Sequence, residues 1–327
     1  MIASVIFALL LYGFWHEAVR TGLVATLGRH IGSAFACFAL LLAVLWYFGF
    51  GLGEWLAEVL RSRVARVVAP ATLAIPYVVF AAPRGGLLQS SKIGLPLFPL
   101  FAIGMALLPV ALAALLEFSN LPQKFTFTWQ DAVALLTIAV VLEARVFAGA
   151  WPYSGLGSMP KLYLADVALY LYVVVRRLEG IGYSLVPRWN DFAVGLREWV
   201  FFLPLALGLG FATHFIHFYP RVPSAGHVIG AVLVIFLLTA IPEELFFRGI
   251  LQNLLERRIC SRMALVITAC LFGLSHFNKG ATFNWRYVIL AAIAGIFYGR
   301  AWRARQHLFA AAITHTLVDV IWGLWFR

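Results

Sequence analysis

The 327-residue sequence has little charge and few cysteines. Only 12% of its residues are charged and 63% are hydrophobic, whereas soluble domains average about 25% charged residues. These proportions exclude an ordinary soluble globular protein. About 9–11 apolar segments recur along the chain, and most approach the roughly 20 residues that a helix needs to cross a bilayer. Because open strand edges have no hydrogen-bond partners in lipid, we predict an all-α, polytopic transmembrane helix bundle of about 9–11 membrane helices.

The cysteines provide neither a disulfide framework nor a thiolate metal site. There are three of them, Cys37, Cys260 and Cys270, and no two have the spacing of paired metal ligands. Cys37 and Cys270 fall inside apolar segments. Disulfide-stapled and zinc-thiolate classes are therefore excluded.

Acidic residues are also scarce, which leaves a net charge of +11. In a soluble protein this excess would suggest nucleic acid, but here the basic residues lie mostly between apolar segments. We therefore predict the lipid bilayer as a partner, and no nucleic acid. Two arginine clusters, at 257–262 and 300–305, favour the cytoplasmic side. The predicted location is an integral, multi-pass protein of the bacterial inner membrane.

A polar stretch at 176–197 divides the chain. It is the longest polar connection in the second half, and it contains paired arginines followed by a segment rich in Gly, Pro, Trp and Asn. We predict an N-terminal transmembrane region at 1–177, of unassigned role, and a C-terminal domain at 178–327 that holds the motifs described next.

Two adjacent carboxylates and an arginine, Glu243, Glu244 and Arg248, stand inside the apolar run Val228–Leu255. Each charge at bilayer depth costs at least ~2.5–3.5 kcal/mol, so three within six positions need an explanation. On a helix Glu244 and Arg248 share a face, while Glu243 points about 100° away from Glu244. One acid can then be held by the arginine while the other is free to react. The alternative is a structural ion pair beside a glutamate that reaches the interface.

Two further apolar segments carry polar groups. His276 ends one of them, and His315 and Asp319 share a helical face in the last. A single buried histidine is more often a packed core residue, but polar groups on three helices together indicate a site. We expect Glu243, His276, His315 and Asp319 to converge on one cavity in the cytoplasmic half of the bilayer. A carboxylate and a histidine can deprotonate water, either directly or on a metal, and the sequence offers no activated nucleophile, so hydrolysis is the predicted reaction.

The ordered set of motifs resembles a known family. Glu243-Glu244-x-x-x-Arg248, Phe272-x-x-x-His276 and His315-x-x-x-Asp319 are similar to the successive motifs of the CPBP intramembrane proteases. That family includes the type II CAAX prenyl endopeptidases and bacteriocin-processing or immunity-related proteins. The resemblance covers about residues 178–327, and residues 1–177 have no comparable match. It implies a CAAX-protease-like domain that cleaves a membrane-anchored peptide or protein.

The resemblance also implies roles for the site residues. Glu243 is the water-activating carboxylate and His276 assists it, while Glu244 and Arg248 support them. His315 and Asp319 match the pair that stabilises the oxyanion or coordinates a metal. The chain departs from the type II CAAX enzymes at Asp319, where they carry Asn, and an ionised Asp cannot donate a hydrogen bond to an oxyanion.

Two versions of the chemistry remain open. In one, a divalent metal such as zinc is bound by side chains from the set Glu243, His276, His315 and Asp319, leaving one position for water. In the other, no metal cofactor is needed: Asp319 accepts a hydrogen bond from His315 and fixes its tautomer, and the other ring nitrogen donates to the oxyanion. We favour the metal-free version.

Two other functions are also weighed. Buried Glu, Arg and His sets serve as proton relays in transporters, but the polar residues gather in the last third of this chain, with no sign of symmetric halves. A non-catalytic immunity or scaffold member of the family is the second alternative, although the intact motifs favour catalysis.

Overall fold

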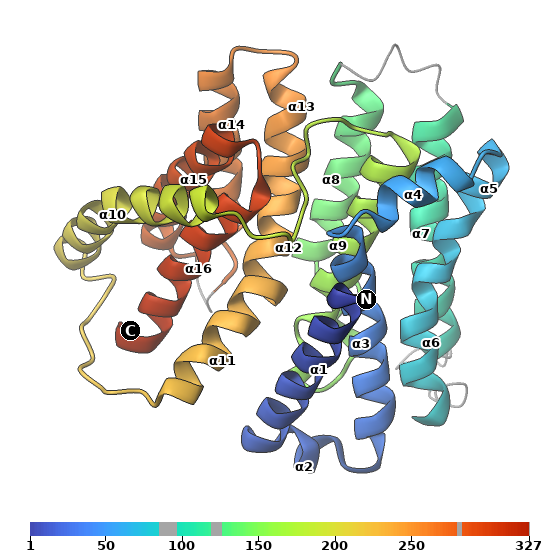
Figure 1. Cartoon of the computed structure of the whole chain (residues 1–327), viewed down its shortest axis with the longest axis horizontal. Helices are drawn as coiled ribbons and strands as arrows, with labels where there is room; N and C mark the ends of the chain where they lie inside the picture. The colour runs from blue at the N-terminus through green and yellow to red at the C-terminus, as the bar shows by residue number, and fades with distance from the viewer. Residues whose placement is uncertain (85–96, 119–125, 280–282, 327) are drawn as a thin grey trace. The chain divides into compact units, whose positions relative to one another are not determined.

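The computed structural model describes residues 1–84, 97–118, 126–279 and 283–326, and it is almost entirely helical (Figure 1). Within these ranges there is no β-strand, and a single isolated antiparallel bridge pairs Phe218 with Phe326. The predicted all-α fold is confirmed.

Seven helices among the described residues are long and apolar enough to cross a membrane. Other described helices fall short of that standard because they are shorter or more charged, among them α8 (Trp129–Glu143), α14 (Ser261–Leu274) and α15 (Trp285–Arg305), which ends in arginines. The seven are fewer than the predicted 9–11, but they confirm an integral multi-pass architecture. They are Ile2–Arg20, Leu23–Phe48, Arg63–Ala81, Pro99–Phe118, Trp189–Ala212, Ala225–Glu256 and Leu308–Trp325.

The chain forms two compact units. The first comprises Met1–Lys124 and Thr128–Arg177, and the second comprises Leu178–Arg327 with the short segment Phe125–Phe127. The main helices of the first unit are α1 (Ile2–Arg20), α2 (Leu23–Leu27), α3 (Ile31–Phe48), α4 (Leu52–Val59), α5 (Arg63–Val68), α6 (Ile75–Ala81), α7 (Leu97–Phe118), α8 (Trp129–Glu143) and α9 (Met159–Leu169), the last continued by a π-helical turn at Tyr170–Val175.

The second unit contains the candidate site. Its helices are α10 (Trp189–Ala212), α11 (Ala225–Ile235), α12 (Ile241–Glu244), α13 (Asn253–Glu256), α14 (Ser261–Leu274), α15 (Trp285–Arg305) and α16 (Leu308–Trp325). Helices α11, α12 and α13 form one continuous helix, Ala225–Glu256, in which π-helical segments at Phe236–Ala240 and Leu245–Gln252 join them.

Small residues allow the helices of the second unit to pack closely around the site. A Cβ on Gly273 of α14 would lie 2.5 Å from the Val288 carbonyl oxygen of α15, and a Cβ on Gly195 of α10 would lie 2.7 Å from Ile313 of α16. Without hydrophobic driving force between helices in lipid, such close approach provides the van der Waals contact that holds them together. The polar side chains of α12, α14 and α16 are thereby brought within reach of one another.

Candidate active site

The two carboxylates sit on a short α-helical turn between two π-helical segments. Before them, the Ile241 amide donates to the Phe236 carbonyl, five residues back, as a π-turn requires. Pro242 contributes to this widening because it has no N–H and its ring clashes with the carbonyl four residues earlier in a regular helix. Wide turns of this kind are frequent at functional sites. Here they bracket Glu243 and Glu244 on α12.

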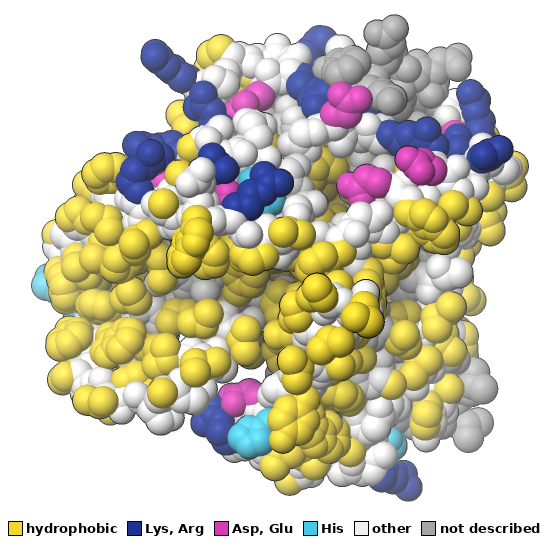
Figure 2. Space-filling model, viewed as in Figure 1, with side chains coloured by type: hydrophobic (Ala, Val, Ile, Leu, Met, Phe, Trp, Pro, Cys, Tyr) yellow, Lys and Arg dark blue, Asp and Glu magenta, His cyan; other side chains and the backbone are white. Residues whose placement is uncertain are grey.

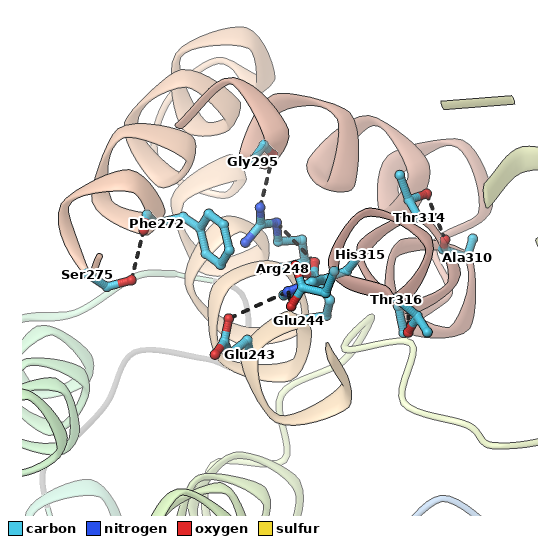
Figure 3. A network of polar contacts seen from close by, with 12 residues as sticks. Glu243, Glu244, Arg248, Phe272, Ser275, Gly295, Ala310, Thr314, His315 and Thr316 are labelled. Atoms are coloured by element: carbon cyan, nitrogen blue, oxygen red, sulfur yellow. Dashed lines mark hydrogen bonds and ion pairs between the residues drawn. The ribbon is translucent and has the colours of Figure 1, made fainter. Parts of the chain in front are cut away.

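Glu244 and Arg248 form a fully buried ion pair, as the spacing predicted. The Arg248 Nε lies 3.2 Å from Glu244 Oε2, and both side chains have no solvent exposure. Arg248 Nη2 also donates to the Gly295 carbonyl of α15 at 3.0 Å (Figure 3). A Cβ at position 295 would lie 3.2 Å from that nitrogen, so glycine leaves room for the guanidinium.

Aromatic rings cover the rest of the guanidinium. Its central carbon lies 4.6 Å from the centre of the Phe272 ring and 5.4 Å from that of Tyr298. A cation over the face of an aromatic ring is attracted by the ring quadrupole, by about 2 kcal/mol or more where water is excluded. Arg248 is therefore held by a carboxylate, a carbonyl and two rings, which fixes both it and Glu244.

His315, on α16, links the acidic residues (Figure 3). Its Nδ1 lies 2.7 Å from Glu244 Oε1, and its Nε2 lies 3.4 Å from Asp319 Oδ2 and 3.8 Å from Glu243 Oε2. The ring also stacks on Tyr298, with centroids 4.6 Å apart and planes 12° apart. Carboxylates therefore face both ring nitrogens, and the stacked tyrosine fixes the plane of the ring.

This arrangement changes one detail of the metal-free prediction. We expected Asp319 to fix the tautomer of His315, but Glu244 lies closer to the ring and occupies Nδ1. A carboxylate only accepts, so Nδ1 carries a proton and donates to Glu244. The nitrogen left to face a reacting group is Nε2, the one nearer Asp319 and Glu243. Spacing alone showed which residues share a helical face, but not which of the two acids the ring would meet across helices.

His276 lies in the turn that follows α14. Its Nδ1 is 2.8 Å from the Phe272 carbonyl oxygen, which can only accept, so this nitrogen is the donor and Nε2 is left as a base. His276 is also largely buried, so few water molecules compete for its Nε2.

Three of the four predicted site residues line one cavity of about 300 Å³: His276, His315 and Asp319. Tyr287 and Tyr298 line it too, and the remaining walls are mainly apolar side chains of α10, α15 and α16. Glu243 is absent from these walls, although its carboxylate lies beside His315 and is 14% exposed. The predicted convergence is thus seen for three residues, with Glu243 adjacent to them.

The acids and histidines were also a predicted metal-ligand set. Among the residues that the structure describes, no group of three or more His, Cys, Asp or Glu side chains is placed to hold a metal ion. One reason is that His315 directs Nδ1 to Glu244, which is itself paired with Arg248. In this arrangement the residues do not fit a metal, and we derive no step through one.

Comparison with known proteins supports the motifs. Residues 225–321 match the family model described as type II CAAX prenyl endopeptidase Rce1-like. The predicted resemblance is therefore confirmed over this stretch, which contains all seven named residues of the three motifs. No curated protein and no solved structure matches the chain. The match lies wholly in the second unit, and the first unit has no assigned relative.

Three residues of the site were missed by the sequence reasoning. Gly295 and Tyr298 of α15 hold Arg248 and His315, and Tyr287 packs against His276 with ring centroids 4.9 Å apart. They lie on a helix with no charged motif of its own between Arg286 and Arg300. The spacing of Gly295 and Tyr298 places them on one face of α15, but nothing in the sequence predicted that this face packs against Glu244 and Arg248.

Proposed function

We propose that the second unit is an intramembrane endopeptidase that hydrolyses a peptide bond of a membrane-associated substrate with an activated water. The observation that carries this proposal is the chain of contacts from Arg248 through Glu244 to His315, next to Glu243, at the edge of a cavity. The family match over residues 225–321 supports a protease.

In this proposal Glu243 is the general base. Arg248 pairs with Glu244, whereas the Glu243 side chain is partly exposed, so a water molecule can reach it. Glu243 takes a proton from water as the oxygen attacks the carbonyl carbon, and the neutral His276 Nε2 assists as a second acceptor. The proton then passes to the leaving amine as the peptide bond breaks.

The negative charge that develops on the carbonyl oxygen needs a donor. His315 is the nearest candidate. Because carboxylates lie beside both ring nitrogens, the ring carries a proton on each in this proposal: Nδ1 donates to Glu244, and the Nε2 proton can be donated to the oxyanion. A preorganised donor at this place lowers the barrier without reorganisation during the reaction. Arg248 holds Glu244 in position, and so acts on the reaction through His315.

The cavity walls favour a substrate with an apolar group beside the scissile bond. They include large apolar side chains such as Trp199, Phe202 and Trp322. The resemblance offers two classes of substrate, a CAAX-type C-terminal tail and an apolar leader peptide. Because the protein is an integral membrane protein, we propose that the substrate reaches the cavity while anchored in the membrane, which in a bacterial cell would be the inner membrane.

A cleavage assay with purified full-length protein in proteoliposomes tests this function. We expect cleavage of at least one of a prenylated CAAX peptide, its unprenylated form or a membrane-anchored leader peptide, and no cleavage by Glu243→Gln. Glu58→Gln, which removes an exposed carboxylate of α4, is the matched control and should be active. Equal rates for wild type and Glu243→Gln would refute the proposal. Proton-coupled transport in the same vesicles, with no cleavage, would instead support the transporter alternative.

A further inference from the structure

An open basin of about 440 Å³ lies in the second unit, where α13 ends, α14 begins and α15 ends. Figure 2 shows Lys and Arg side chains, with Asp and Glu between them, gathered above the hydrophobic surface near these helix ends. The basin shares no residue with the candidate active site. Its polar lining residues are Arg197, Glu198, Glu256, Ser261, Arg300, Arg303 and Gln306.

A buried glutamate fixes two of the arginines. Glu198 Oε1 accepts a hydrogen bond from Arg197 Nη2 at 2.7 Å, and Glu198 Oε2 lies 2.9 Å from Arg300 Nε. The Glu198 side chain is 1% exposed, whereas those of Arg197 and Arg300 are 50% and 46% exposed. One carboxylate thus holds two guanidiniums in place and neutralises only one of their charges, while their outer N–H groups remain accessible.

Arg303 adds a third fixed guanidinium. Its Nε lies 3.4 Å from Glu256 Oε1, and its Nη2 donates to the Ser261 hydroxyl at 2.9 Å. Ser261 is the first residue of α14, so the positive end of that helix dipole faces the same place. Three arginines and two glutamates leave the basin with a net positive charge. Two further arginines are close in sequence to its lining residues: Arg258 in the connection between α13 and α14, and Arg262 in the first turn of α14.

We propose that this basin binds a phosphate group, carried by the headgroup of an anionic phospholipid. Several guanidiniums approaching from two helices suit an anion with several acceptor oxygens, since each planar fork can donate to a pair of them. The ends of long apolar helices lie at the depth of the headgroups, where basic side chains attract anionic lipid. Free inorganic phosphate offers the same chemistry, so the test must separate these two sources.

The experiment uses native mass spectrometry of the full-length protein, with phosphatidylglycerol or phosphatidylcholine titrated into the detergent. We expect saturable binding of phosphatidylglycerol, and binding that is at least about tenfold weaker in Arg300→Ala, since a charge-assisted hydrogen bond contributes about 1.5–3 kcal/mol. Arg286→Ala removes the same charge from the exposed start of the same helix, outside the basin, and should bind as wild type does.

A second variant keeps the test valid if Arg300→Ala folds poorly. In the double variant Glu198→Gln/Arg300→Ala, one negative and one positive charge are removed together, so the net charge of the protein is unchanged. No buried carboxylate is left without its arginine, and binding of phosphatidylglycerol should be weakened as in Arg300→Ala. Inorganic phosphate is titrated separately, with binding read from the melting temperature. Arg300-dependent binding of phosphate but not of phosphatidylglycerol identifies free phosphate as the ligand. Phosphatidylglycerol and phosphate affinities that are unchanged in both folded variants overturn the proposal.

Discussion

Each of the two units buries an acid–arginine pair, and the two pairs have different surroundings. In the first unit Arg176 Nε lies 3.1 Å from Asp131 Oδ1, with both side chains almost fully buried. The Asp131 carboxylate also accepts hydrogen bonds from the Thr128 hydroxyl and amide, and the Thr128 hydroxyl oxygen accepts from the Asp131 amide, which completes a capping box at the start of α8. In the second unit the acid of the pair, Glu244, instead continues to His315 and hence towards the cavity.

The difference shows that a charge at membrane depth does not by itself indicate catalysis. The contacts of Asp131 named above are made only with Thr128, at the start of α8, and with Arg176. A structural role therefore accounts for this pair. Asp166 of α9 is also fully buried, and neither of its carboxylate oxygens has a hydrogen-bond partner among the described residues. What distinguishes the second unit is that the ion pair orients a further titratable side chain, which faces two more carboxylates beside a cavity.

The largest expected effect separates catalysis from stability within the second unit. Glu243→Gln removes the proposed base but keeps the shape of the side chain and leaves the buried Glu244–Arg248 pair intact. We expect cleavage to fall by at least about 10²–10⁴-fold, the usual contribution of general acid–base catalysis, with an unchanged melting temperature. Initial rates and thermal unfolding of the same preparation check this. If the Glu243→Gln protein were active, the buried charges of the second unit would have only a structural role, like the Arg176–Asp131 pair of the first unit.

The next prediction compares the two pairs directly. Arg248→Ala and Arg176→Ala each leave a buried carboxylate without its cation, which costs about 3–5 kcal/mol. Both variants should therefore melt earlier, and unfolding of each in mild detergent measures this. Arg248→Ala should in addition lower the rate per folded molecule, because Glu244 then loses the partner that positions it for His315. If the folded Arg176→Ala protein lost as much activity as the folded Arg248→Ala protein, the conclusion that only the pair of the second unit acts on the reaction would be wrong.

A smaller effect is expected at Gly295. Alanine there would place its Cβ 3.1 Å from Ala269 Cα and 3.2 Å from Arg248 Nη2, closer than side chains normally pack. We expect a loss of about 1–3 kcal/mol of stability from overpacking, together with reduced activity as the guanidinium shifts. Gly208→Ala is the control, because a Cβ at that position of α10 has no neighbour within 4 Å. It should be neutral or slightly stabilising, as alanine favours helix more than glycine does.

Much of the site was predictable from the sequence because helix periodicity is local. The spacings of Glu244 with Arg248 and of His315 with Asp319 fixed which side chains share a face, and both contacts are present. Contacts between helices were not predictable, because they depend on how α12, α15 and α16 cross. The contact of Glu244 with His315, and the support from Gly295 and Tyr298, therefore emerged only in the structure.

The smallest expected effect concerns Asp319 and decides between the two versions of hydrolysis. In the metal-free version Asp319 is the weaker partner of His315, at 3.4 Å and with 37% of its side chain exposed, whereas Glu244 lies at 2.7 Å and is fully buried. Glu244 alone can then hold the ring, and the amide oxygen of an asparagine still accepts from Nε2. We expect Asp319→Asn to lose less than about tenfold in rate, equivalent to about 1.4 kcal/mol.

In the metal version the same substitution removes an anionic ligand and should abolish activity. Elemental analysis of the purified protein is therefore paired with the Asp319→Asn rate, and with cleavage after chelation and after zinc is added back. Asp319→Ala extends the comparison, because it removes the acceptor altogether and should be slower than Asp319→Asn in either version. Stoichiometric zinc together with an inactive Asp319→Asn protein would contradict the metal-free reading, and His315 would then have to turn away from Glu244 to serve as a ligand.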